Sequence, residues 1–135
     1  VLHAVMTSHI DRLVEDVDTA MQMVTDARSR LRFLLRLFMK DYVGAAARQK
    51  VLLNDLENLP EDKRVGIVAK QRYIVDAVQA LLTEIEPKLS RDKAEARART
   101  MLLFGMINWT GNWYNVAGPI KPDTIADMAL EMVSG

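Results

Sequence analysis

Hydrophobic and polar positions follow each other along the chain with the spacing of helices. At the start, apolar side chains recur every three or four residues, which is the period of one face of an α-helix. That face consists of Leu2, Met6, Ile10, Leu13, Val17, Ala20 and Val24. The pattern therefore predicts an amphipathic first helix of about six turns.

Five more helices are predicted after the first, each bounded by residues that commonly begin or end a helix. The second is capped by Thr25 or Asp26 and ends near Gly44, and its wide apolar arc is typical of a central helix. The third runs from Ala45 to Leu59, and the fourth lies between Pro60 and Pro87. The fifth is capped by Ser90 and ends before Gly118, and the sixth begins at Pro122. Little of the sequence alternates as a strand does, so we predict an all-α fold, a six-helix bundle.

The stretch from Met101 to Gly118 contains both tryptophans, and its residues up to Ile107 carry no polar side chain. On a helical wheel it has two apolar stripes about 100° apart. One stripe comprises Leu102, Met106, Trp109 and Trp113, and the other comprises Leu103, Ile107, Thr110 and Tyr114, flanked by Phe104 and Gly111. A helix with two apolar faces must be covered on two sides. We expect one face to meet the rest of the chain and the other to meet a second copy of the same helix.

With 135 residues, half of them hydrophobic, the chain has the size and composition of one folded domain. Eighteen basic and eighteen acidic residues balance, so no net field attracts DNA or an anionic membrane. Cysteine is absent and no apolar run is long enough to span a membrane, which together fit a cytoplasmic protein. The sequence begins without methionine inside a helical pattern, so we expect it to be part of a longer protein.

No group of side chains suited to catalysis or metal binding is visible in the sequence. His3 and His9 fall on different sides of a helix, and neither has a glutamate three positions before it, as di-iron bundles require. Glu84 and Glu86 point in nearly opposite directions on a helix. Glycine-rich phosphate loops and nucleophile elbows are also missing. The sequence therefore predicts a protein that is not an enzyme and that holds no metal or cofactor.

A row of basic side chains follows the second predicted helix at four-residue spacing. It consists of Arg28, Arg32, Arg36 and Lys40, which share one face of the helix. One interpretation is a solvated face opposite the apolar arc. The other is a row of phosphate contacts, for instance for the nucleotide end of a coenzyme A thioester. The sequence leaves both interpretations open.

Short motifs near the end of the chain form a further pattern. They are Gly105-Met106-Ile107-Asn108-Trp109, Trp113-Tyr114, Gly118 and Lys121-Pro122-Asp123-Thr124-Ile125-Ala126. This pattern resembles the TetR/AcrR family of bacterial transcriptional regulators, and Leu2-His3-Ala4-Val5 resembles the helix that follows their DNA-reading unit. The resemblance implies that the last two helices of each subunit form a dimeric four-helix bundle. Lys121 departs from the Ser or Thr common in the family, which weakens the cap of the last helix.

The resemblance also implies a ligand cavity between the helices. Eight methionines suit an adaptable apolar lining, since methionine is flexible and polarizable. The expected ligand contacts are Phe38, Met39, Tyr42, Tyr73, Ala77, Met106 and Trp109. Core packing is the alternative for each of them. Tyrosine hydroxyls and a tryptophan N–H would suit a hydrophobic small molecule with one polar end, such as an acyl or aromatic coenzyme A thioester.

The surface expected to pair with a second copy lies on the last two helices. Thr110 and Gly111 are small, which would let a partner helix approach closely. The full set expected at the homodimer interface is Phe104, Ile107, Thr110, Gly111, Tyr114, Met128 and Met132. A symmetric pairing would use the same residues on both subunits.

These features predict an effector-binding and dimerisation domain, residues 1–135, of a TetR-like transcriptional repressor. The helix-turn-helix unit of such regulators has no counterpart in the sequence, so operator DNA is expected to be contacted only through a missing N-terminal domain. A hydrophobic effector would release DNA by favouring the state that does not bind it. The alternative is an all-α protein–protein interaction module without a small-molecule ligand. A densely packed interior would favour that alternative.

Overall fold

The computed structural model describes residues 2–23, 25–44, 60–115 and 117–134, and of residues 2–7 and 42–44 it describes the backbone alone. Within these ranges the chain forms five α-helices: α1 (Leu2–Met23), α2 (Ala27–Gly44), α4 (Glu61–Ile85), α5 (Lys93–Trp109) and α6 (Pro122–Ser134). Two short 3-10 helices, η2 (Pro87–Arg91) and η3 (Thr110–Asn112), flank α5. The described part contains no strand, and the all-α prediction is confirmed. The third predicted helix, Ala45 to Leu59, lies outside the described residues.

Local hydrogen bonds explain where two of the helices begin. The carboxylate of Asp26 accepts a hydrogen bond of 2.9 Å from the backbone N–H of Ser29, which caps α2 as the sequence predicts. The prediction that Ser90 caps α5 is wrong, because its hydroxyl donates to a carbonyl within η2. Asp92 is the cap, and its side chain accepts from the N–H of Glu95 at 3.0 Å. The 3-10 turn therefore delays the start of α5.

The helix predicted between Ser90 and Gly118 ends early, at Trp109, where η3 begins. The hydroxyl of Thr110 donates to the carbonyl of Met106 at 2.8 Å, which satisfies the hydroxyl inside the chain. A 3-10 turn winds more tightly than an α-helix, so the residues after it depart from an ideal helical wheel. The last turn of the predicted helix is therefore a separate element.

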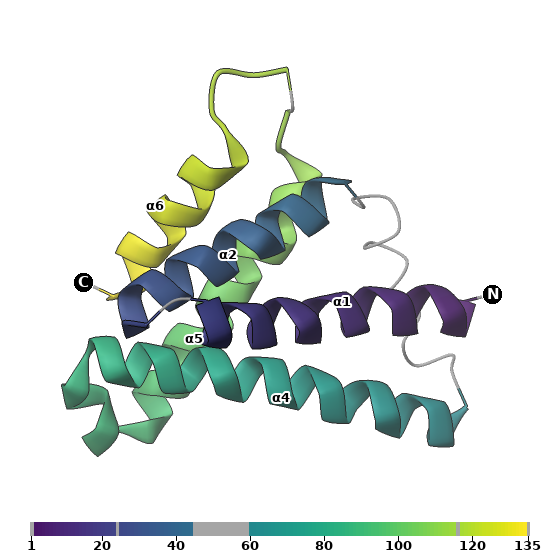
Figure 1. The fold of residues 1–135 in the computed structure, drawn as a ribbon, viewed down its shortest axis with the longest axis horizontal. Helices are drawn as coiled ribbons and strands as arrows, with labels where there is room; N and C mark the ends of the chain where they lie inside the picture. The colour runs from purple at the N-terminus through teal and green to yellow at the C-terminus, as the bar shows by residue number, and fades with distance from the viewer. Residues whose placement is uncertain (1, 24, 45–59, 116, 135) are drawn as a thin grey trace.

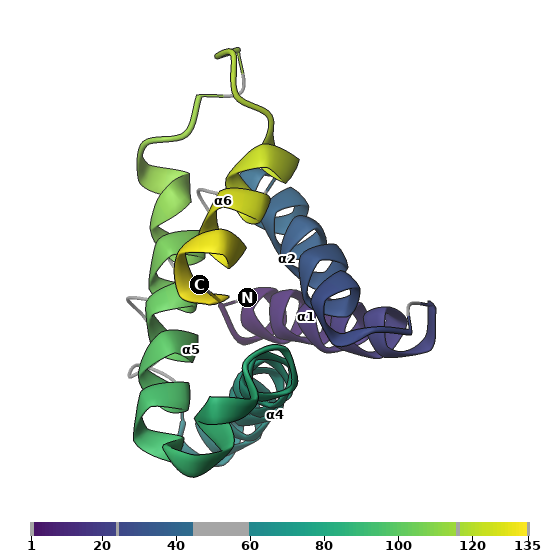
Figure 2. The same cartoon turned by 90° about the vertical axis from the view of Figure 1, so that its left-hand side faces the viewer.

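The helices pack around α2, as its wide apolar arc predicts. α1 and α4 lie side by side, and α2 crosses them and packs against α6 on its other side (Figure 1). Seen after a turn of 90°, α5 runs along one side of the molecule, where it contacts α4 and α6 (Figure 2). In the described part, α2 contacts each of the four other helices.

The centre of the hydrophobic core comes from α2. The side chains that are at most 1% exposed on this helix are Leu31, Leu34, Leu35, Phe38 and Met39. The ring of Phe38 lies 6.1 Å from that of Phe104 on α5, at an interplanar angle of 37°. This separation is within the range in which aromatic pairs attract. Buried residues of α1, α4, α5 and α6 join the same cluster, so the described helices share one core.

A bidentate ion pair holds α6 against α2. The guanidinium group of Arg36 donates to the two carboxylate oxygens of Asp127 at 3.0 and 2.6 Å. Arg32 approaches the same carboxylate at 4.0 Å. Bidentate pairs of this kind fix orientation as well as distance. The Arg36–Asp127 pair fixes the side of α6 that faces α2. It thereby helps to keep the neighbouring Met128 on a side that is exposed.

Replacing Asp127 with asparagine is expected to lower the free energy of unfolding by roughly 0.5–1 kcal/mol at pH 7, as for other partly exposed ion pairs. The hydrogen bond from Arg36 holds the pKa of Asp127 below its usual range. Such a carboxylate stabilises the fold above its unfolded pKa of about 3.9, and this contribution is lost as the pH falls through the folded pKa. In urea unfolding, the difference between the two proteins should shrink as the pH is lowered from 7 to 3. A constant difference contradicts the prediction.

Candidate functional site

Large apolar side chains on one side of α5 are exposed to solvent. Leu102 is 65% exposed, Trp109 is 66% exposed and Trp113, just after η3, is 57% exposed. Met106 lies half-buried between Leu102 and Trp109. Spacings of three and four residues place Leu102, Met106 and Trp109 along one face of α5. Trp113 lines the same groove as Met106 and Trp109. Isolated apolar residues are common on protein surfaces, but a contiguous group that includes two tryptophans is typical of a binding surface.

The exposed methionines of α6 continue this surface. Met128 is 47% exposed and Met132, one turn later, is 69% exposed. Between α6 and α5 lies a groove of about 270 Å³, whose walls include Met106, Trp109 and Trp113. The surface formed by Leu102, Met106, Trp109, Trp113, Met128 and Met132 is called the α5–α6 face below.

The end of this face is supported from within the chain. The rings of Trp113 and Tyr114 pack edge to face, with their centroids 6.3 Å apart and an interplanar angle of 75°. The hydroxyl of Tyr114 donates to the carbonyl of Ile120 at 2.8 Å. These contacts connect the residues after α5 to those before α6, so the two sides of the groove are joined at this end.

The residues predicted for the homodimer interface divide between the surface and the core. Met128 and Met132 are exposed on the α5–α6 face. In contrast, Ile107 and Thr110 are each 1% exposed, and Phe104 packs against the core beside Phe38 of α2. The small side chain of Thr110 is therefore covered by the chain's own helices and is not accessible to a partner.

Gly111 and Tyr114, the other two predicted interface residues, are half-buried. The stripe of α5 expected to face a partner thus faces the core, which corrects the placement made from the sequence. A helical wheel detects two apolar stripes but contains no information on which one α2 and α6 cover. The exposed Leu102 and Trp113 were not among the predicted interface residues, although their stripe was visible on the wheel.

The residues predicted to contact a ligand lie in different places. Phe38 and Met39 are fully buried in the core, and Ala77 packs against the core from α4. Met106 and Trp109 line the groove of the α5–α6 face. The described members of the set therefore do not converge on one volume.

Tyr73, another predicted ligand contact, is 48% exposed and joins α4 to α1. Its hydroxyl donates to the carboxylate of Asp18 at 2.8 Å, and this bond raises the pKa of Tyr73. The ammonium group of Lys70 contacts Asp11 nearby on α1. Two polar bonds therefore connect these helices along their length. The side chain of Tyr42, the remaining predicted contact, lies outside the described residues.

Part of the basic row on α2 is engaged in the fold. Arg36 pairs with Asp127, and Arg32 lies near the same carboxylate. Lys40 is exposed and Arg28 is half-buried. The row is therefore not a purely solvated face, since its Arg36 side chain joins α2 to α6.

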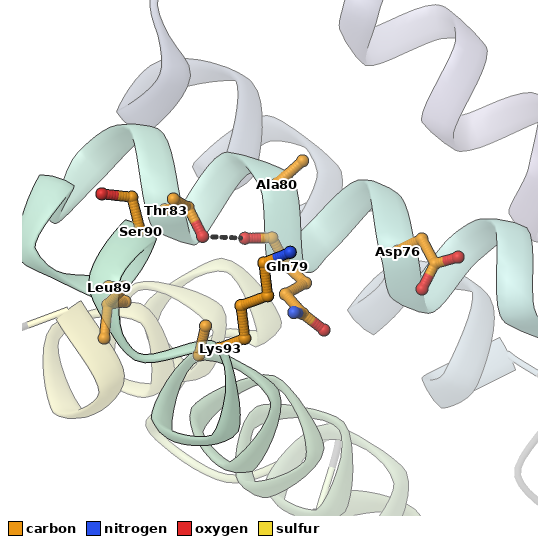
Figure 3. A pocket seen from close by; sticks show the side chains of 8 residues that line it. Asp76, Gln79, Ala80, Thr83, Leu89, Ser90 and Lys93 are labelled. Atoms are coloured by element: carbon orange, nitrogen blue, oxygen red, sulfur yellow. Dashed lines mark hydrogen bonds between the residues drawn. The ribbon is translucent and has the colours of Figure 1, made fainter.

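A second hollow, of about 470 Å³, lies between α4, η2 and the start of α5 (Figure 3). Its polar side chains largely bond within the chain. The hydroxyl of Thr83 donates to the carbonyl of Gln79 at 2.9 Å. Arg97 reaches the side chains of Asp76 and Gln79 at 3.3 and 3.4 Å. These bonds leave the hollow a weaker candidate than the α5–α6 face, whose apolar groups contact solvent.

The described residues were also compared with the requirements of a metal site and of a membrane-spanning helix. In these ranges, no three His, Cys, Asp or Glu side chains are grouped so that they could hold a metal ion. None of the described helices is both long enough and apolar enough to cross a membrane.

Comparison with known proteins identifies relatives over most of the chain. A family model described as Tetracyclin repressor-like, C-terminal domain, matches residues 24–135. A TetR-family transcriptional regulator from Bordetella parapertussis 12822 is 32% identical, with a TM-score of 0.90 over 98% of this chain and 69% of its own. None of the curated proteins is a significant match to the sequence.

Two more distant structures share the fold. PfmR, a TetR-family regulator from Thermus thermophilus, is 16% identical, with a TM-score of 0.80 over 98% of this chain and 72% of its own. AibR, solved in complex with isovaleryl coenzyme A and operator DNA, is 22% identical, with a TM-score of 0.76 over 97% of this chain and 71% of its own. At these identities the likeness concerns the fold alone.

Proposed function

We propose a function from the premise that this chain belongs to the TetR family of transcriptional regulators, as a C-terminal domain. Members of this family are transcription factors and not enzymes. The proposed function is to pair with a second copy and to bind a hydrophobic small molecule that controls DNA binding by an N-terminal domain. The α5–α6 face is the observation that carries this proposal.

The apolar character of the α5–α6 face supports dimerisation through this surface. Trp109 and Met132 are both about two-thirds exposed on it, at 66% and 69%. Covering such side chains removes apolar surface from water at roughly 25 cal/mol per Å². A twofold axis near the groove would place α5 and α6 of two copies against each other as four helices. The same surface then serves both subunits.

The effector is proposed to be a hydrophobic molecule, for example an acyl or aromatic coenzyme A thioester. The isovaleryl coenzyme A complex of AibR supports this class of ligand by fold similarity. The proposed contacts are Phe38, Met39, Tyr42, Tyr73, Ala77, Met106 and Trp109, whose described members lie in separate places in this packing. Because Phe38 and Met39 are fully buried, a ligand that reaches them must favour a more open packing of α2. Binding would then shift the population between two states of the domain.

DNA release is proposed to pass through α1. In this mechanism the effector moves α1 in each subunit, which changes the separation of two DNA-reading heads and makes the protein a repressor. The heads must match half-sites about one helical turn apart, so a small displacement suffices. The balanced charge of the chain supports contact with operator DNA only through the N-terminal domain.

Native mass spectrometry of the purified chain tests both parts of this proposal. At tens of micromolar we expect a dimer, and after incubation with a panel of acyl and aromatic coenzyme A thioesters we expect added mass on that dimer. A strict monomer would contradict the proposed pairing. A chain boiled and refolded without small molecules serves as the control for ligands carried through purification.

An all-α interaction module without a small-molecule ligand is the alternative. The complete burial of Phe38 and Met39 favours it, because dense packing leaves no room beside these side chains without rearrangement. A dimer that gains no mass from any member of the panel would support this alternative.

A further inference from the structure

Two carboxyl groups from different helices meet between α1 and α2. Asp16 lies on α1 and Asp41 on α2, and their side chains are within hydrogen-bonding distance of each other. One oxygen of each, Oδ2, is shielded from solvent and receives no hydrogen bond from the described part of the chain. A carboxylate can only accept hydrogen bonds, so two ionised groups here repel each other. One shared proton would supply the missing donor.

The surroundings of Asp16 favour its protonated form. Burial has the largest influence, followed by the hydrogen bond and the negative charge of Asp41, and together they raise the pKa of Asp16 to about 8. Arg12, one turn earlier on α1, opposes this shift, and Glu15 reinforces it. Because the interacting group on α2 is itself a carboxyl, the protonated form of Asp16 can donate a hydrogen bond to it, which joins the two helices.

Helix α4 also packs against α1, but its cationic and polar groups contact carboxylates of α1 other than that of Asp16. Lys70 contacts Asp11, and the hydroxyl of Tyr73 donates to Asp18. Neither contact involves Asp16 or Asp41. The polar contacts between α1 and α4 are therefore separate from the Asp16–Asp41 contact between α1 and α2.

We propose that Asp16 and Asp41 form a proton-dependent clasp, which holds α1 against α2 while the two carboxyl groups share a proton and loosens when that proton is lost. The buried apolar side chains of α1, Ile10, Leu13, Val17 and Ala20, keep the helix in the fold in both states. Loosening therefore changes the position of α1 on α2 rather than unfolding the domain. A consequence for DNA binding rests on the proposed function, whereas the clasp itself does not.

Carbon-detected NMR of the aspartate carboxyl groups in the full chain tests the clasp directly. We expect the Asp16 carboxyl carbon to titrate with a midpoint of about 8. In Asp41→Asn the midpoint should fall, because an amide can donate to an ionised Asp16 and no longer repels it. An Asp16 midpoint below pH 6, or one that Asp41→Asn leaves unchanged, would overturn the proposal.

A stability measurement gives an independent check. A carboxyl with a raised pKa binds more protons in the folded state, so the fold loses stability as the pH rises toward that pKa. We expect the urea midpoint of the unchanged protein to fall between pH 6 and 8 and to level off above that. Asp16→Asn, which keeps the shape and supplies an N–H donor, should hold its midpoint nearly constant. Parallel curves for both proteins would contradict the clasp.

Asp62→Asn is the matched control, because it removes the charge of an exposed aspartate at the start of α4. It should retain the pH dependence of the unchanged protein. Failure of the clasp would leave the dimer and its added mass in native spectra intact. Failure of the proposed function would leave the titration of Asp16 intact, so the two outcomes are distinguishable.

Discussion

Replacing Phe38 with alanine is expected to lower the free energy of unfolding by roughly 3–5 kcal/mol. Phe38 is 0% exposed at the centre of α2, and its ring lies 6.1 Å from Phe104. Removing the ring loses its burial and leaves a cavity among helices that cannot fully collapse around it. Domains of this size are stable by about 5–15 kcal/mol in total, so this single change removes a large share. Urea unfolding at a fixed protomer concentration measures the loss.

Val65→Ala is the control for that measurement, because Val65 is 60% exposed on α4. Its effect should remain within about 0.5 kcal/mol. If Phe38→Ala costs no more than the control, Phe38 does not pack in the core. The same variant bears on ligand binding: a ligand that contacts the ring should bind more weakly to Phe38→Ala, whereas a purely structural ring leaves affinity unchanged in the folded fraction.

Much of the fold could be predicted because it depends on local chemistry. The repeat of apolar residues on α2 identifies a central helix from sequence spacing alone, and the structure confirms that α2 contacts every other described helix. Asp26 caps α2 and Pro122 begins α6, since both preferences come from the backbone groups left unpaired at a helix start. The prediction that Ser90 caps α5 failed because Pro87–Arg91 form a 3-10 turn, in which the Ser90 hydroxyl donates to the carbonyl of Pro87.

The candidate site was harder to predict because it depends on packing between distant segments. The α5 stripes containing Trp109 and Ile107 are both apolar, and only the positions of α2 and α6 decide that Ile107 is buried and Trp109 is exposed. Asp16 and Asp41 are ordinary polar positions on two amphipathic helices. Nothing in their spacing indicates that the crossing of α1 and α2 brings them together.

Replacing Met132 with glutamate is expected to weaken the homodimer at least tenfold, or about 1.4 kcal/mol. Met132 is 69% exposed on the α5–α6 face, and a symmetric interface would bring a new carboxylate from each copy to the same apolar surface. Desolvating these charges without partners opposes association. Light scattering across a dilution series measures the change in dissociation constant.

Met23→Glu is a closely matched control for Met132→Glu. Met23 is 71% exposed and, like Met132, lies in the last turn of its helix, so both substitutions meet the same unfavourable helix dipole. Met23 ends α1, away from the α5–α6 face, and its substitution should leave dimerisation unchanged. Equal weakening by both variants would contradict this interface.

The two tryptophans of the chain offer a second readout of the same prediction. Trp109 and Trp113 both line the groove of the α5–α6 face, so their fluorescence reports on that surface. In the dimer we expect the emission to be shifted to shorter wavelength, because the indole rings are removed from water. Met132→Glu should shift it toward longer wavelength at concentrations where the unchanged protein is dimeric. Dissociation without a spectral change would place the dimer contact elsewhere on the chain.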